Sequence, residues 1–126
     1  MPSAEEEIAE GEQSLSTLDY DSAYKHFDKA CKADPKNSVA FFGKAESALG
    51  VPKVEAEEIL GLYKKAIELD PENPQYHDAL ASFCVDLGRF NEAEEHYNKA
   101  AGLDEDNAPF YWSEFAINYA RKAPVA

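Results

Sequence analysis

The sequence of 126 residues predicts an all-α protein in which one pair of helices is repeated along the chain. Three series of residues recur at intervals of 36 and then 34 positions: Phe27, Tyr63 and Tyr97; Ala30, Ala66 and Ala100; and Asn37, Asn73 and Asn107. Self-similarity at a fixed period of about 20–50 residues is typical of repeat proteins. Similar turn sequences at 34–37 and 70–73, each beginning with Asp-Pro, separate one unit from the next.

The repeat divides the chain into three units, at 4–37, 38–73 and 74–107, within a single domain that spans 1–126. Each unit is expected to hold two helices of about 14 residues, which are marginal alone and need packing. The middle unit has two extra residues, and we expect segment 51–56 either to form a longer turn or to start the second helix early. A capping helix is expected at 108–120, which brings the total to about seven helices. A frayed tail at 121–126 is expected to follow it.

Turn and capping residues predict where these helices begin and end. Asn37 is a favoured N-cap, and Pro74 suits a first helical position because the N–H it lacks has no partner inside the helix. Gly88 can end a helix in the left-handed conformation. Asn91 resembles the start of a capping box, and Asp21 could cap the equivalent helix of the first unit.

The spacing of small and aromatic residues resembles the tetratricopeptide repeat (TPR) family. The first unit has small residues, an aromatic residue and a proline at the characteristic positions: Gly11, Ala23, Phe27, Ala30 and Pro35. The third unit matches with Ala81, Ala93, Tyr97 and Ala100. In the middle unit Ile59 stands where a small residue is expected, which suggests a splayed or re-registered hairpin. The resemblance implies a right-handed α-solenoid of helix-turn-helix hairpins.

The resemblance also implies a concave groove lined by the first helix of each unit and by the last helix. The corresponding residues form an apolar floor with carboxylates and without Lys or Arg: Ile8, Glu12, Leu15, Phe42, Gly43, Glu46, Leu49, Asp78, Ala79, Ser82 and Trp112. One interpretation is a solvated acidic face, partly covered by the last helix. The other is a groove for a basic-apolar peptide or helix of a partner protein, anchored on apolar residues and steered by the acids. In that groove, Gly43 and Ala79 would leave room for the backbone of the ligand.

Within the TPR family, the domains that bind chaperone tails hold the terminal carboxylates with a clamp of Lys, Asn and Arg. The residues at these places are Ile8, Glu12, Gly43, Gln75 and Ala79, so we expect no clamp and repulsion of an acidic peptide. The alternative function is structural, with a homodimer formed through the last helix, whose aromatic residues are Phe110, Tyr111, Trp112 and Phe115.

Charge and composition exclude several other classes. The chain has 12 Lys and Arg against 25 Asp and Glu, a net charge of −13, which opposes binding to nucleic acid or to an anionic membrane. The start is acidic where a signal peptide would be basic and then apolar, and no apolar run suits a membrane span, so we predict a cytoplasmic protein.

Cysteines and histidines complete the prediction. We expect Cys31 and Cys84 to be buried thiols, and His26, His77 and His96 lack the spacing of metal ligands. The groove carboxylates have no catalytic partner or Gly-punctuated calcium loop, so the sequence predicts no enzyme activity, no cofactor and no metal.

Overall fold

The computed structural model describes residues 2–122 and contains seven α-helices, one short 3-10 helix and, within that range, no strand. The prediction of an all-α protein with about seven helices is confirmed. The chain divides into two compact units, Met1–Pro71 and Glu72–Ala126.

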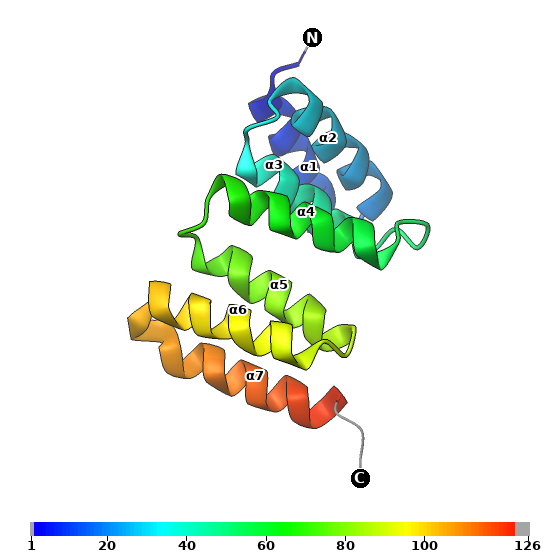
Figure 1. Ribbon diagram of the computed structural model, residues 1–126. Helices are drawn as coiled ribbons and strands as arrows, with labels where there is room; N and C mark the ends of the chain where they lie inside the picture. The colour runs from blue at the N-terminus through cyan, green and yellow to red at the C-terminus, as the bar shows by residue number, and fades with distance from the viewer. Residues whose placement is uncertain (1, 123–126) are drawn as a thin grey trace. The chain divides into compact units, whose positions relative to one another are not determined.

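The first unit consists of four helices, each packed against the next (Figure 1): α1 (Ala4–Ser16), α2 (Tyr20–Ala33), α3 (Ser38–Ala48) and α4 (Ala56–Leu69). Helix α1 also contacts α3. Between α3 and α4 the chain forms a turn, in which Val51 is buried and its carbonyl accepts a hydrogen bond from the Val54 N–H at 3.0 Å. The extra residues of the middle repeat are therefore in the longer turn, and α4 does not start early.

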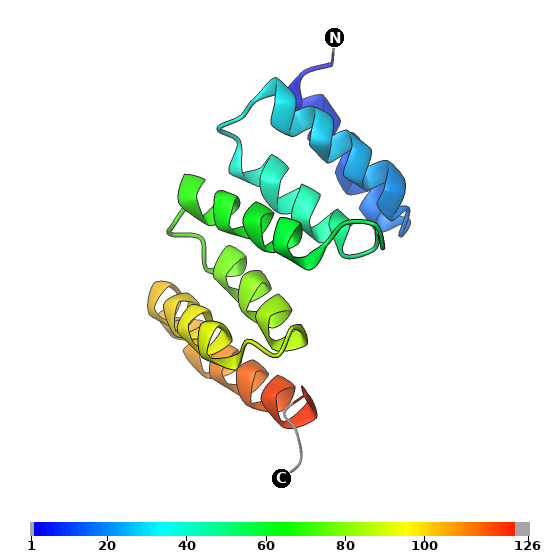
Figure 2. The same cartoon turned by 45° about the vertical axis from the view of Figure 1, so that its right-hand side comes forward.

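The second unit consists of three α-helices and the 3-10 helix (Figure 2): α5 (Pro74–Asp86), α6 (Phe90–Leu103), η1 (Glu105–Asn107) and α7 (Ala108–Lys122). Helix α6 packs against both α5 and α7, and α5 also contacts α7. Helix α7 continues two residues past the predicted end at 120. The rest of the predicted frayed tail, 123–126, is outside the described residues.

Several predicted caps are present. The Asn37 side chain accepts a hydrogen bond from the Ala40 N–H at 3.3 Å, and Asn73 caps α5, with Pro74 in its first turn. Gly88 ends the turn after α5 with a φ of 77°. In the first unit, Leu18 occupies the place of Gly88 and has a φ of 61°, which is strained for a residue with a branched side chain.

Two predicted caps were wrong. Asp19, not Asp21, caps α2 and accepts the Ser22 N–H at 3.2 Å, because the helix already begins at Tyr20. Asn91 lies inside α6, which begins at Phe90 without a side-chain cap. The Arg89 N–H closes the preceding turn on the Cys84 carbonyl at 2.8 Å, so the chain re-enters a helix directly afterwards.

The small and aromatic residues of the repeat form the core. Phe27, Tyr63 and Tyr97 are among the largest fully buried side chains, and the repeat alanines are also buried. Phe27 lies between α1 and α3 at two glycines: a Cβ on Gly11 would lie 2.7 Å from its ring, and one on Gly43 would overlap the ring. The small residues are therefore required because three helices meet at one aromatic ring. Ile59 fits the middle hairpin as a buried residue.

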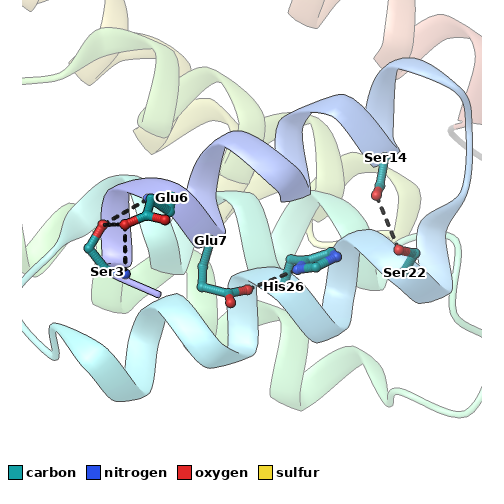
Figure 3. A network of polar contacts seen from close by, with 6 residues as sticks. All are labelled: Ser3, Glu6, Glu7, Ser14, Ser22 and His26. Carbon is teal, nitrogen blue, oxygen red and sulfur yellow. Dashed lines mark hydrogen bonds and ion pairs between the residues drawn. The ribbon is translucent and has the colours of Figure 1, made fainter. Parts of the chain in front are cut away.

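Polar contacts reinforce the first hairpin (Figure 3). Ser3 and Glu6 form a capping box at the start of α1, in which the Ser3 Oγ accepts the Glu6 N–H at 3.1 Å. A buried Glu7 on α1 contacts the Nδ1 of His26 on α2 at 2.8 Å. These contacts connect the acidic first turn both to its own helix end and to α2.

The same two repeat positions carry a histidine pair in the second unit. The Nδ1 atoms of His77 and His96 lie 3.2 Å apart, and the rings are stacked. Burial and the neighbouring His77 lower the pKa of His96. Within residues 2–122, no group of three or more His, Cys, Asp or Glu side chains could hold a metal ion.

Candidate functional site

Two adjoining hollows lie on the face that α1 and α3 share in the first unit. The smaller has a volume of about 170 Å³ and is lined by Glu12, Leu15, Phe27, Val39, Phe42, Gly43 and Glu46. The larger, of about 500 Å³, is lined by Leu15, Tyr20, Glu46, Leu49 and Gly50. Because they share Leu15 and Glu46, we treat them as one surface and call it the α1/α3 groove.

The α1/α3 groove combines exposed apolar side chains with carboxylates. Leu49 is 51% exposed and Val39 is 45% exposed, although both are aliphatic. Glu12 and Glu46 are the charged residues of the lining, which contains no Lys or Arg. A negative and apolar surface is suited to a ligand that offers cations next to apolar groups.

The base of the groove is held by Tyr63 of α4. Its hydroxyl donates a hydrogen bond to Glu46 Oε2 at 2.6 Å, and its ring meets Phe42 edge-on with centroids 5.9 Å apart. Tyr63 is fully buried, so these contacts fix both side chains from below. Glu46 and Phe42 are thus positioned before any ligand arrives.

The lysine of α3 is directed away from the groove and toward α2. Lys44 is 18% exposed, and its Nζ lies 2.9 Å from Asp28 Oδ1 and 5.4 Å from the centre of the Tyr24 ring. Burial alone would raise the pKa of Asp28, but its ion pairs with Lys44 and Lys32 outweigh this and lower it. The charge of Lys44 is therefore paired with Asp28 on the side of α3 that faces α2, and not in the α1/α3 groove.

The structure brings six of the predicted site residues together in the α1/α3 groove: Glu12, Leu15, Phe42, Gly43, Glu46 and Leu49. Ile8 does not join them, because it is 9% exposed and belongs to the core with Phe27 and Ala40. Gly43 lines the groove, but the space beside its Cα is filled by Phe27 and is not left for a ligand backbone.

The other predicted site residues belong to the second unit. Asp78 on α5 is hydrogen-bonded to Glu114 on α7, and Ser82 to the Tyr97 hydroxyl. Trp112 lies against α6, where its Nε1 donates to Asn98 Oδ1 at 3.1 Å. Ala79, also on α5, is half-buried. Asp78 and Trp112 therefore make contacts between helices of the second unit.

The carboxyl pair of the second unit is chemically unusual. Partial burial, together with the hydrogen bond and the charge of Asp78, raises the pKa of Glu114 to about 7. One oxygen of each group, Asp78 Oδ1 and Glu114 Oε2, is buried without a hydrogen-bond partner in the described part of the chain. Two carboxyl groups in contact share a proton more easily than they ionise together.

Helix α7 is rotated relative to the orientation that the repeat predicts. In α3 the third residue, Ala40, lies in the core, whereas the corresponding Phe110 of α7 is 62% exposed. Helix α7 instead buries Tyr111, whose hydroxyl donates to Asp104 at 2.9 Å, and places Phe115 against Tyr97. No described helix follows α7 to cover these two large side chains, so they pack on α6. The expectation that Trp112 faces the groove depended on the unrotated helix.

Sequence reasoning missed the roles of Tyr20, which lines the α1/α3 groove, and of Tyr63, which supports Glu46 and Phe42 from beneath it. Tyr20 lines it from the start of α2, and its ring occupies the space that a Cβ on Gly50 would need. Tyr63 was recognised only as a core aromatic residue. A usable signal was available, because a buried tyrosine hydroxyl needs a partner and the preceding helix carries Glu46 among its polar residues.

The two cysteines are buried thiols, as predicted. Burial raises the pKa of Cys31 to about 11, which disfavours the reactive thiolate.

Comparison with known proteins agrees with this architecture. A family model described as tetratricopeptide repeat matches residues 62–95. "Protein STIP1 homolog" of Dictyostelium discoideum is 35% identical over 98 residues, which is 78% of this chain and 17% of that protein. The chain belongs to the tetratricopeptide repeat family. TPR domains are protein-interaction modules, and the chain has the repeat and the fold of such a module.

A second relative, "Small glutamine-rich tetratricopeptide repeat-containing protein 2" of Mycosarcoma maydis, is 27% identical over 107 residues, 85% of this chain and 30% of that protein. The chain thus spans less than a third of either relative. Among solved structures, the first TPR domain of Spaghetti (RPAP3), bound to the HSP90 peptide SRMEEVD, has a TM-score of 0.83 and 19% identity, and the match covers 96% of this chain and 94% of that one. This likeness confirms the TPR fold. Within residues 2–122, no helix combines the length and apolar character needed to cross a bilayer.

Proposed function

We propose that the α1/α3 groove binds a segment of a partner protein that carries both basic and apolar side chains. The observation that carries this proposal is the lining itself, in which exposed aliphatic residues alternate with two carboxylates and no cation is present. The apolar side chains of the partner segment would supply most of the binding energy. Its Lys or Arg side chains would fix the orientation through Glu12 and Glu46.

The pre-positioned side chains favour this mechanism. Phe42 and Glu46 are held by Tyr63, so binding costs little side-chain entropy at these two residues. Leu49 and Val39 are exposed and lose contact with water when a ligand covers them. The ligand therefore gains apolar burial and a fixed acidic contact at the same place.

We further propose that the chain does not bind an acidic chaperone tail, although the first TPR domain of Spaghetti is bound to the peptide SRMEEVD. That peptide has three acidic side chains and a terminal carboxylate, and it needs cations. At the clamp positions of the first unit, Ile8 is in the core and Glu12 is an exposed carboxylate. Gln75 and Ala79, at the clamp positions of the third repeat, also lack the positive charge that such a peptide needs.

We propose a cytoplasmic location for this activity. Cys31 and Cys84 are buried thiols and not a disulfide, as expected for a reducing compartment. Fluorescence microscopy of the tagged protein in its source cell tests this point, and accumulation in the secretory pathway would contradict it.

Isothermal titration with two peptides tests the binding proposal: an amphipathic peptide of Leu and Lys, and SRMEEVD. We expect the basic peptide to bind and its affinity to fall as salt is raised, because screening weakens the contacts with Glu12 and Glu46. Glu12→Lys should weaken binding by about threefold to tenfold. Glu10→Lys is the matched control, because Glu10 is exposed on α1 and does not line the groove.

Two results would contradict the proposal. One is tighter binding of SRMEEVD than of the basic peptide. The other is an equal effect of Glu12→Lys and Glu10→Lys, which would mean that only the overall charge matters.

A further inference from the structure

Helix α7 leaves one face without cover from any other helix of residues 2–122. Phe110 and Ile117 on this face are 62% and 59% exposed. A hollow of about 210 Å³ lies between them, and its lining comes from α7 alone: Phe110, Ser113, Glu114, Ile117 and Asn118. The face results from the rotation of α7 and is distinct from the α1/α3 groove.

We propose that this face binds the same face of a second copy of the chain, with the two α7 helices antiparallel. The two-fold axis would pass between Ser113 and Glu114. Phe110 and Ile117 are equally far from this midpoint along the sequence, so Phe110 of each copy would pack on Ile117 of the other. Isologous pairing of one patch with itself is the usual way in which a closed dimer forms.

The charges at the two ends of α7 support the antiparallel orientation. Asp106 is exposed in η1, just before α7 begins, and Arg121 is exposed in the last turn of α7. An antiparallel pair places Arg121 of each copy next to Asp106 of the other, which gives two ion pairs. A parallel pair would instead bring the two Arg121 side chains together, so charge complementarity selects the antiparallel arrangement.

The centre of the face permits close approach. Ser113 is small, and two helices whose contact residues are small can approach to about 8 Å between axes. Glu114 lines the hollow, and its carboxyl group interacts with Asp78 of its own unit. One helix pair buries less than the roughly 1,200 Å² of a standard stable interface, so we expect a weak dimer with a Kd on the order of 100 µM.

Sedimentation equilibrium of the full chain, from about 5 to about 500 µM, tests the proposal. We expect reversible dimerisation in the wild type and a monomer for Ile117→Glu. Ile117 is exposed, so circular dichroism should show an unchanged helix content in this variant. Leu103→Glu is the matched control, because Leu103 is 42% exposed but outside the face, and it should dimerise like the wild type.

Charge reversal tests the orientation. Arg121→Asp alone should weaken the dimer by about tenfold, and the double variant Asp106→Arg, Arg121→Asp should restore it, because both ion pairs form again with opposite sign. A monomeric wild type, dimers of Ile117→Glu, or failure of the double variant to restore association would each overturn the proposal. Peptide affinity at the α1/α3 groove is independent of these variants, so the two proposals can fail separately.

Discussion

Replacing Glu114 by Gln should make the protein more stable at alkaline pH and leave its stability near pH 4.5 unchanged. In the folded chain the pKa of Glu114 is raised from 4.5 to about 7, first by burial and then by its hydrogen bond and charge interaction with Asp78. As the pH rises from 4.5 to 7, the unfolded chain releases this proton while the folded chain retains it. Stability therefore falls across this window and reaches a plateau above it.

The size of this effect follows from the displacement of the pKa. A carboxyl group displaced this far would cost up to about 3 kcal/mol at pH 8 if it were wholly shielded from solvent. Glu114 is only partly buried, so solvent screening reduces the expected cost to about 1–2 kcal/mol. Glutamine keeps a hydrogen-bond donor for Asp78 at every pH and removes the second negative charge. We therefore expect Glu114→Gln to gain about 1–2 kcal/mol at pH 8.

The assay is urea unfolding followed by the fluorescence of Trp112, the single tryptophan of the chain, which lies on α7 itself. Measurements at pH 4.5, 6, 7 and 8 give the difference between variant and wild type, in which the titration of other groups cancels. Glu10→Gln, on the exposed face of α1, is the control and should show no such pH dependence. A difference that stays constant with pH, or a variant that is less stable than wild type at pH 8, would refute the reasoning.

Three further variants test other parts of the structure by thermal or urea unfolding. Gly43→Ala should destabilise the first unit by about 1–3 kcal/mol because its methyl group would overlap the buried Phe27 ring. In the control Gly61→Ala the added methyl group would have no atom within 4 Å, so the variant should be more stable by up to about 1 kcal/mol, because alanine favours the helix α4. Leu18→Gly should stabilise the protein by about 1 kcal/mol by relieving a φ of 61°. His96→Asn should reduce the loss of stability below pH 6.5, since the pKa of His96 is lowered and the unfolded chain takes up the proton first.

Much of the fold could be predicted from the sequence because a few residues are compatible with only one local environment. Phe27, Tyr63 and Tyr97 had to be buried against small residues, and their spacing located the helix pairs. Asn37 and Pro74 placed two helix starts, because capping depends on neighbouring residues alone. The capping rules failed at Asp21 and Asn91, because there the preceding turn determines the residue at which the helix begins.

The candidate site was only partly accessible. Glu12, Phe42 and Glu46 follow from repeat positions within one compact unit, and the structure brings them together. Trp112 was misplaced because repeat positions assume an unrotated last helix, whereas burial of Tyr111 and Phe115 decides how α7 packs. Ile8 was misplaced because an apolar residue at the edge of a helix face can turn toward either the core or the groove.

Phe27 also determines how the first unit can open. Its ring is 1% exposed and touches Gly11 on α1 and Gly43 on α3, so neither helix can detach without bringing an aromatic side chain into water. That exposure costs about 2–3 kcal/mol, so the amide hydrogens of α1, α2 and α3 should exchange with deuterium as one cooperative unit. A segment bound in the α1/α3 groove would then slow exchange along α2 as well, including at amides on the side of α2 that faces away from the ligand.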